Sequence, residues 1–329
     1  MDISFNPEGK IVAWAGEPIQ VEHSIQGDPA LLQEVDVWRS EFETWSKKVL
    51  GYAADNFDLK GCSTQDCSMG NFFNDAMLAA ARKTALAKRS KAYPWPDFSF
   101  CNTGGIRSGI PKGNVTVEYV VTTSPFGNYM VQLPLTGKEI LAMLEGVVVG
   151  KNTETGKDVT SFIQVSGMRF TYDSAARPSP PAGAANTTLP ATAPSRSRIL
   201  KAEVQDRKKR WRRIMPRQTY NVVTMDFVMT GGDNILVKKP RPKALTLERM
   251  DDMLMKEVET KGRISPYVDG RIRDVVPPVA RNSDEISIVD LLSFQANPLG
   301  WPPGTPAYLR REFPHGPEQM HQVYAYLRR

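Results

Sequence analysis

DFSFCNTGGIR, residues 97–107, joins a short apolar strand to a loop that contains two glycines. Glycine lets the backbone approach a ligand closely, and Gly104 and Gly105 are flanked by an amide, Asn102, and a guanidinium, Arg107. An arginine at such a place can pair with phosphate or hydroxyl oxygens. The stretch therefore indicates a strand whose end carries ligand-binding groups, although a Gly-Gly loop is more often only a turn.

Two other loops carry side chains of the same kind. SPFG (124–127) presents Phe126 on a turn, and DFVMTGGD (226–233) presents a second ring before a glycine turn and a carboxylate. Two rings and a carboxylate match the needs of a nucleoside, which has a base to stack and two cis hydroxyls to accept from. A core phenylalanine and an ordinary turn are the commoner interpretation of each loop alone.

The regions around these loops mix helix and strand patterns without strict alternation, which favours an α+β fold with mixed sheets and packed helices. The apolar spacing and capping residues predict helices after Asp28, over 71–88, after a Thr136–Glu139 capping box, and over 246–258. Strands are expected at 97–101, at 116–123, at 161–173 with a break at Gly167, and on both sides of 207–213.

Metal ligands and catalytic motifs are scarce in this sequence. Its three histidines, His23, His315 and His321, follow no metal-binding spacing, whereas a two-metal phosphoesterase needs several His and carboxylate ligands close together. No serine-hydrolase elbow, P-loop or dinucleotide fingerprint is present. The residues alone therefore propose no catalytic group, and no metal or cofactor bound by this chain.

Charge and hydropathy limit the partners. The net charge of +6 is modest for 329 residues, and much of the excess lies in RKKRWRR (207–213). A solvated hairpin is the favoured interpretation of this basic run, and nucleic acid or another polyanion is the alternative. No apolar run is long enough to span a bilayer, and the first residues do not form a signal peptide.

The three cysteines differ in setting. Cys62 and Cys67 lie five positions apart, close enough for a disulfide, and a zinc site is disfavoured because no histidine is nearby. Cys101 ends an apolar strand and is expected to be a buried thiol. A disulfide would indicate an oxidising compartment, which conflicts with the absence of a visible signal peptide.

Several segments together resemble the 5'-nucleotidase family, which includes ecto-5'-nucleotidases and bacterial UDP-sugar hydrolases. They occur in the family's order and at about its spacing: CSMGNFFNDAM (67–77), CNTGGIRSGI (101–110), SPFGNYMVQLPLTGKEI (124–140), SFIQVSGMRFTYD (161–173), DFVMTGGDNI (226–235) and YVDGRIRDV (267–275). The resemblance covers about residues 1–275. It also favours pairing of Cys62 with Cys67 in a disulfide.

The resemblance implies a role for each residue of the three loops. Phe126 and Phe227 would sandwich a nucleobase, Asp233 would hold the ribose hydroxyls, and Asn102 and Arg107 would contact the nucleotide. The glycines that would shape these loops are Gly104, Gly105, Gly231 and Gly232. Ser63 stands where the family usually has an arginine, which implies weaker nucleotide binding or a shifted substrate preference.

The domain organisation is also an expectation from the resemblance. Residues 1–25 would be the remnant of an N-terminal metallophosphoesterase domain, 26–55 a bridging helix, and 56–275 the substrate-binding domain. A disordered insertion is expected at 174–198, and residues 276–329 are unassigned. Two divalent metals of the Zn or Mn type, with a His–Asp pair, would lie in the missing domain in cis, upstream of Met1. The parent protein would be secreted or extracellular, its signal peptide lost with that domain.

The expected partner is a 5'-nucleotide or nucleoside, with no nucleic acid. A complete enzyme would hydrolyse a 5'-nucleotide to nucleoside and phosphate in nucleotide catabolism, and this chain alone is expected to be inactive. One alternative is a stand-alone, catalytically inactive nucleoside-binding module. Another is a polyanion-binding protein that uses residues 207–213.

Overall fold

The structure is a computed structural model that describes residues 2–17, 22, 24–176 and 197–275. One compact unit contains Met1–Thr171 and Ile199–Arg273. Most of a second unit, Tyr172–Arg198 and Asp274–Arg329, lies outside the described residues. The predicted insertion at 174–198 lies outside the described residues except for a few residues at its two ends. The whole of the unassigned segment 276–329 also lies outside them.

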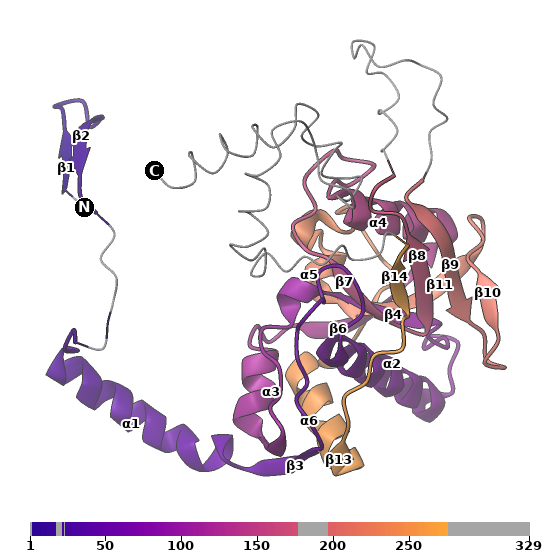
Figure 1. The fold of residues 1–329 in the computed structure, drawn as a ribbon, viewed down its shortest axis with the longest axis horizontal. Helices are drawn as coiled ribbons and strands as arrows, with labels where there is room; N and C mark the ends of the chain where they lie inside the picture. Colours follow the sequence, from indigo (N-terminus) through magenta and orange to yellow (C-terminus); the bar gives the residue numbers. More distant parts are fainter. Residues whose placement is uncertain (1, 18–21, 23, 177–196, 276–329) are drawn as a thin grey trace, which may run out of the picture. The chain divides into compact units, whose positions relative to one another are not determined.

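The core of the compact unit is a five-stranded mixed sheet (Figure 1). Its strands stand in the order β12 (Leu245–Arg249), β6 (Tyr129–Thr136), β11 (Thr219–Met225), β4 (Phe98–Asn102) and β7 (Ile163–Ser166). β11 and β4 are parallel, whereas the other neighbours are antiparallel. This mixture of helices and mixed sheets confirms the predicted α+β class.

A four-stranded sheet and a three-stranded sheet complete the unit. The first has the order β10 (Trp211–Arg213), β9 (Ile199–Gln205), β8 (Met168–Tyr172) and β14 (Ile272–Asp274). The second has the order β13 (Arg263–Ile264), β3 (Val49–Ala53) and β5 (Gly113–Thr116). β7 and β8 are separated at Gly167, as predicted, because its backbone takes φ +72 and a Cβ would lie 2.9 Å from the Asp97 carbonyl oxygen.

Helices cover these sheets. α2 (Ser68–Lys88) packs against β4 and β7, and α6 (Met250–Lys261) packs against α2 and β3 (Figure 1). α4 (Gly137–Val149) begins at the predicted capping box, in which Thr136 Oγ1 accepts from the Glu139 amide. Two helical turns, α5 (Asp226–Met229) and η2 (Gly232–Asn234), follow β11, and η1 (Thr103–Gly105) follows β4.

Two sequence expectations need correction. Residues 116–123 are rich in β-branched side chains and were expected to form a strand, yet Val117–Thr123 form helix α3. Val117, Val120 and Thr123 are the buried residues of α3, so burial at a spacing of three outweighs β propensity. The helix expected over 246–258 begins only at Met250, because Leu245–Arg249 form the edge strand β12.

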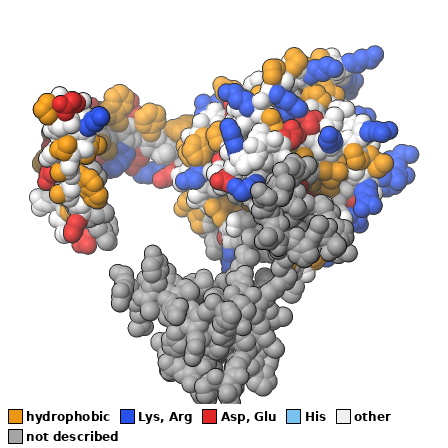
Figure 2. Space-filling model, turned by 90° about the horizontal axis from the view of Figure 1, so that it is seen from above, with side chains coloured by type: hydrophobic (Ala, Val, Ile, Leu, Met, Phe, Trp, Pro, Cys, Tyr) orange, Lys and Arg blue, Asp and Glu red, His pale blue; other side chains and the backbone are white. Residues whose placement is uncertain are grey.

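The N-terminal segment forms separate elements. β1 (Asp2–Phe5) and β2 (Ile11–Ala15) form a hairpin, and α1 (Pro29–Ser46) is capped by the Asp28 carboxylate, as predicted. Within the segment 26–55 the helix therefore ends at Ser46, and β3 follows. None of these three elements buries a residue, and Figure 2 shows hydrophobic side chains on the surface of this segment. No helix in the described ranges is long and apolar enough to cross a bilayer.

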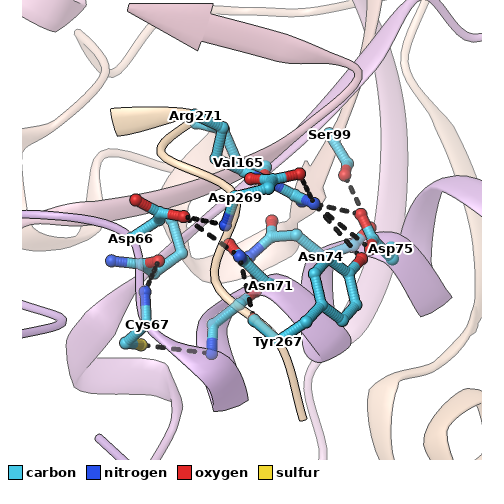
Figure 3. A network of polar contacts seen from close by, with 12 residues as sticks. Asp66, Cys67, Asn71, Asn74, Asp75, Ser99, Val165, Tyr267, Asp269 and Arg271 are labelled. Carbon is cyan, nitrogen blue, oxygen red and sulfur yellow. Dashed lines mark hydrogen bonds and ion pairs between the residues drawn. The ribbon is translucent and has the colours of Figure 1, made fainter. Parts of the chain in front are cut away.

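The predicted Cys62–Cys67 disulfide is present, and its loop is built into the fold. The Asp66 carboxylate in this loop is buried and accepts hydrogen bonds from Asn71 Nδ2 and from the amides of Asp269 and Gly270 (Figure 3). The disulfide loop therefore holds the start of α2 and the chain that leads into β14. Cys101 is the buried thiol that was expected, and burial raises its pKa to about 12.

Candidate functional site

The three predicted loops lie at one end of the five-stranded sheet. β4 is parallel to β11, so their carboxyl ends meet at the same edge, and β6 and β7 begin there because they run the opposite way. The register supports this, since Asn102 pairs with Ile163 and Met225 pairs with Met130. Residues far apart in sequence are thereby gathered at one sheet edge.

Asn102 and Asp233 form the centre of this edge. Asn102 Nδ2 donates to Asp233 Oδ2 at 2.6 Å, across 131 positions of sequence. The other carboxylate oxygen of Asp233 accepts from Thr160 Oγ1 at 2.9 Å. Asn102 is buried, and its Oδ1 atom has no hydrogen-bond partner within the described ranges. The edge therefore contains a fixed carboxylate and an unused amide oxygen.

The backbone around Asp233 is unusual. Gly231 takes φ +98, and Asp233 and Asn234 each take φ +53, a region that Asp and Asn tolerate better than most residues. The turn is held from outside, because Asn234 Nδ2 donates to the Asp158 carbonyl at 2.8 Å. The orientation of the Asp233 carboxylate is thus fixed by both its backbone and its neighbours.

Two of the predicted glycines make room for site residues. A Cβ atom on Gly232 would lie 2.4 Å from the Phe227 ring. A Cβ atom on Gly105 would lie 2.8 Å from Met225 Cε and 2.9 Å from Asn102 Oδ1. Gly104 is less crowded, since its nearest neighbours are the Asn102 and Ser161 side chains at 3.4 Å. The Phe227 ring therefore rests against backbone that only glycine can provide.

Both predicted aromatic side chains are open to solvent. Phe126 is 57% exposed and Phe227 is 43% exposed, although each adjoins a buried strand. The guanidinium of Arg107 lies 5.8 Å from the centroid of the Phe126 ring, a cation–π arrangement. Two exposed phenylalanine rings and a cation at one sheet edge form a surface of the kind that marks a binding site.

Two residues of this edge were missed in the sequence. Ser161 Oγ accepts from the Gly104 amide at 2.9 Å and lies 3.1 Å from Thr103 Oγ1, and Thr160 binds Asp233 as described above. Both precede β7, and their signal was a pair of hydroxyl residues at the start of the predicted strand 161–173, with Thr160 just before it and Ser161 as its first residue. Such a pair is common, so only the register of β7 against β4 reveals their position.

Ser63 is exposed in the disulfide loop. This loop is tied to β7, because Gln164 Nε2 donates to the carbonyls of Cys62 and Gln65, each at 2.8 Å. Gln164 directly follows Ile163, the partner of Asn102 in the sheet. The loop that carries Ser63 is therefore anchored one residue from the edge that contains Asn102.

The described ranges contain no group of three or more His, Cys, Asp or Glu side chains that could hold a metal ion. The two metals that the family resemblance implies thus have no fitting ligand set among these residues. The carboxylate of Asp233 is instead engaged by Asn102 and Thr160. No reaction step is assigned to this edge.

Comparison with known proteins identifies the family of this fold. Residues 48–239 match the family model described as 5'-nucleotidase, C-terminal domain, so the chain belongs to that family. An apyrase of Tabanus yao is 24% identical over 82% of this chain and 46% of its own length. The 5'-nucleotidase of Homo sapiens is 26% identical over 83% of this chain and 45% of its own length.

The solved structures agree. The crystal structure of a 5'-nucleotidase precursor from Thermus thermophilus has a TM-score of 0.57 and 25% identity, and the match covers 84% of this chain and 49% of that one. The chain therefore spans about half the length of the relatives it matches here. Residues 48–239 are thus a C-terminal domain of the 5'-nucleotidase type.

Proposed function

We propose that the sheet edge at Asn102 and Asp233 binds the nucleoside part of a 5'-nucleotide. The observation that carries this proposal is the carboxylate of Asp233, fixed by Asn102 and Thr160 beside an unused amide oxygen. A carboxylate offers about four lone-pair sites, of which two are occupied here, so two remain for vicinal hydroxyls. The unused Oδ1 of Asn102 supplies one more acceptor.

The two exposed phenylalanine rings serve the base in this proposal. Phe126 precedes β6 and Phe227 follows β11, which are antiparallel neighbours, so both rings stand at the same end of the sheet. Stacking of a base on an aromatic side chain contributes about 1–3 kcal/mol and depends little on base identity. The site therefore accepts a range of nucleotides, including a nucleotide sugar, and Arg107 contacts the nucleotide through its guanidinium.

The whole protein is proposed to be a metal-dependent phosphoric monoester hydrolase. A two-metal domain in the same polypeptide, of which residues 1–25 are the last part and 26–55 the connection, would supply the attacking water. The exposed apolar stripe of α1, which includes Trp38, Phe42 and Trp45, is suited to packing against such a domain. The Cys62–Cys67 disulfide supports an extracellular parent.

The proposal is tested by calorimetric titration of the chain with adenosine and with AMP. We expect both to bind, and Phe227→Ala to weaken both by about 10-fold to 100-fold, because one stacking face is lost. Phe5→Ala, which removes an exposed phenylalanine on β1, serves as the control and should change neither affinity. Undetectable binding of both ligands by the unaltered chain would contradict the proposal.

A phosphate-release assay tests whether this chain catalyses hydrolysis by itself, and the native mass tests whether it is part of a larger enzyme or a separate nucleoside-binding module. The chain, supplied with Zn or Mn, is expected to release no phosphate from AMP. Phosphate release that survives further purification would overturn the assignment of catalysis to another domain. Binding of adenosine by a native protein of 36.7 kDa would instead favour the alternative of a catalytically inactive nucleoside-binding module.

A further inference from the structure

A cavity of about 810 Å³ lies at the opposite end of β7 from the candidate site. Its lining includes Ser166 and Gly167, where β7 ends, whereas Asn102 pairs with Ile163, where β7 begins. Its volume is in the range of small-molecule sites. The nucleoside site proposed above uses none of its residues.

The floor of the cavity is one face of the four-stranded sheet. Along β8, Met168, Arg169, Phe170 and Thr171 all contribute to the lining, but Met168 and Phe170 are buried whereas Arg169 and Thr171 are half-buried. Along β9, Lys201, Glu203 and Gln205 line it, while Ala202 and Val204 are buried on the other face. Successive side chains of a strand point to opposite faces, so the sheet turns a charged face to the cavity and an apolar face to the core.

The lining carries a positive excess. Six cationic side chains are opposed by three carboxylates, a formal excess of three: Arg82, Arg169, Lys201, Lys209, Arg271 and Arg273 against Asp75, Glu203 and Asp269. A concave surface with an excess of one sign of charge concentrates counter-ions. Figure 2 shows lysine and arginine side chains gathered at the right-hand edge of this unit, where Figure 1 draws β9 and β10.

Part of this charge is neutralised within the protein. Glu203 pairs with Arg169 at 2.7 Å and with Lys201 at 3.0 Å. Arg271 donates to Asp75 at 2.7 Å and to Asp269 at 2.8 Å, as Figure 3 shows. Although burial opposes it, these two carboxylates hold the pKa of Arg271 above its ordinary value. Arg271 is therefore structural, and the excess resides in other cations.

Three cations of the lining lack a carboxylate partner in the described part of the chain. Lys209 and Arg273 are exposed and form no ion pair there, and Arg82 donates only to the backbone carbonyls of Pro96 and Asp97. They come from three elements: Arg82 from α2, Lys209 from the turn between β9 and β10, and Arg273 from β14. Cations on separate elements suit a ligand with several anionic groups.

Part of the basic run 207–213 lines the cavity. Lys209 and Trp211 belong to the lining, and the Trp211 ring lies 4.4 Å from the Arg169 guanidinium. Arg210 and Arg212 are paired with Asp206 at 3.0 and 3.3 Å. Of the cations of the run that form no ion pair in the described residues, Lys209 lines the cavity, whereas Arg207, Lys208 and Arg213 are exposed outside its lining.

We propose that this cavity binds a small polyanion, an inorganic or organic molecule with two or more phosphate groups. Unpaired cations at separate points of a concave wall match separate phosphate groups, and charge-assisted hydrogen bonds to phosphate are stronger than neutral ones. The site is independent of the nucleoside site.

The probe is inorganic tripolyphosphate, titrated into the full chain by calorimetry. We expect binding that weakens about tenfold or more in Lys209→Gln/Arg273→Gln, because two direct phosphate contacts are lost. Lys208→Gln/Arg213→Gln is the matched control, since it removes the same charge from exposed residues outside the lining and should change the affinity by less than about twofold. Thermal melting without ligand establishes that both pairs fold.

Competition separates this proposal from the nucleoside site. Saturating adenosine and the variant Phe227→Ala should leave tripolyphosphate affinity unchanged. No detectable binding of tripolyphosphate, equal weakening by the two double variants, or displacement by adenosine would each overturn the proposal. Tighter binding of a single-stranded RNA than of tripolyphosphate would overturn it in favour of a nucleic-acid surface.

Discussion

Single residues determine the shape of the candidate site, and a glycine, which has no side chain, is as important there as the larger residues. Gly232 has no Cβ atom, and the Phe227 ring occupies the space where that atom would be. Phe227 is also nearly half exposed, so few other contacts fix its ring. The position of this ring therefore depends on a glycine five residues away.

This dependence predicts the effect of Gly232→Ala. The added methyl group would lie 2.4 Å from the ring, so we expect the ring to move and adenosine affinity to fall by about tenfold, the loss of one stacking contact. Phe5→Ala, which alters an exposed residue of β1 outside this site, is the control and should leave adenosine affinity unchanged. Calorimetric titration of both variants checks this, and an unchanged affinity for Gly232→Ala would contradict it.

Only some residues of the candidate site could be predicted from the sequence. The loops of Asn102, Phe126, Phe227 and Asp233 could be found because each combines glycine or a turn with a ligand-type side chain after or before a strand. Ser161 could not be found, because a hydroxyl residue at the start of a predicted strand has no distinctive pattern. Its contact with the Gly104 amide exists only through the register of two strands.

Among the elements, the two helix starts marked by the caps Asp28 and Thr136 were predicted well, whereas the helix expected from 246 begins only at Met250 and one strand was predicted wrongly. The caps at Asp28 and Thr136 are local signals, since the cap and the amides it binds are at most three residues apart. Helix α3 is different, because its β-branched sequence favours a strand and its helical form depends on packing of Val117 and Val120. Such packing partners are distant in sequence, so propensity alone misleads there.

The start of α4 predicts a pH dependence of stability. Burial raises the pKa of Glu139, but hydrogen bonds from Lys239 and Thr136 outweigh it, and the net effect lowers this pKa from 4.5 to about 2. A lowered pKa in the folded state stabilises the fold above the unfolded pKa, and this contribution is lost as the pH falls from about 4.5 to about 2. Denaturant unfolding between these values should show the loss.

Glu139→Gln should reduce the slope of the free energy of unfolding against pH, because an amide does not titrate. Glu41→Gln, which alters an exposed residue of α1, is the control and should leave the slope as in the unaltered protein. An unchanged slope in Glu139→Gln would contradict the assigned role of the Glu139 carboxylate.

The disulfide gives a second prediction for an element. Closing the short loop from Cys62 to Cys67 is worth about 2 kcal/mol by loop entropy, so reduction should lower the free energy of unfolding by about that amount. Cys62→Ser/Cys67→Ser should be destabilised similarly and should not respond further to reductant. If reductant still destabilised the double variant, the effect of reductant would not come from the Cys62–Cys67 disulfide. The one other cysteine, Cys101, is a buried free thiol.

For the whole molecule, the N-terminal elements differ from the rest of the compact unit in how they are stabilised. β1, β2 and α1 bury no residue, whereas α2 and β4 are largely buried. A chain that begins at Lys47 should therefore unfold in denaturant with a free energy within about 1 kcal/mol of the full chain, because little apolar area is lost. A loss of several kcal/mol would show that α1 packs on the remainder.

The strand order has a consequence for biosynthesis. β11 is the middle strand of the five-stranded sheet, yet its residues are translated after those of β4, β6 and β7. Until it leaves the ribosome, β4 and β6 each lack a neighbour and expose backbone donors and acceptors. The nascent chain must therefore wait with unpaired apolar strands until β11 joins β4 to β6, and β12 then completes the sheet at the other side of β6. Translation pauses before Thr219 would lengthen this vulnerable interval, and chaperones would act there.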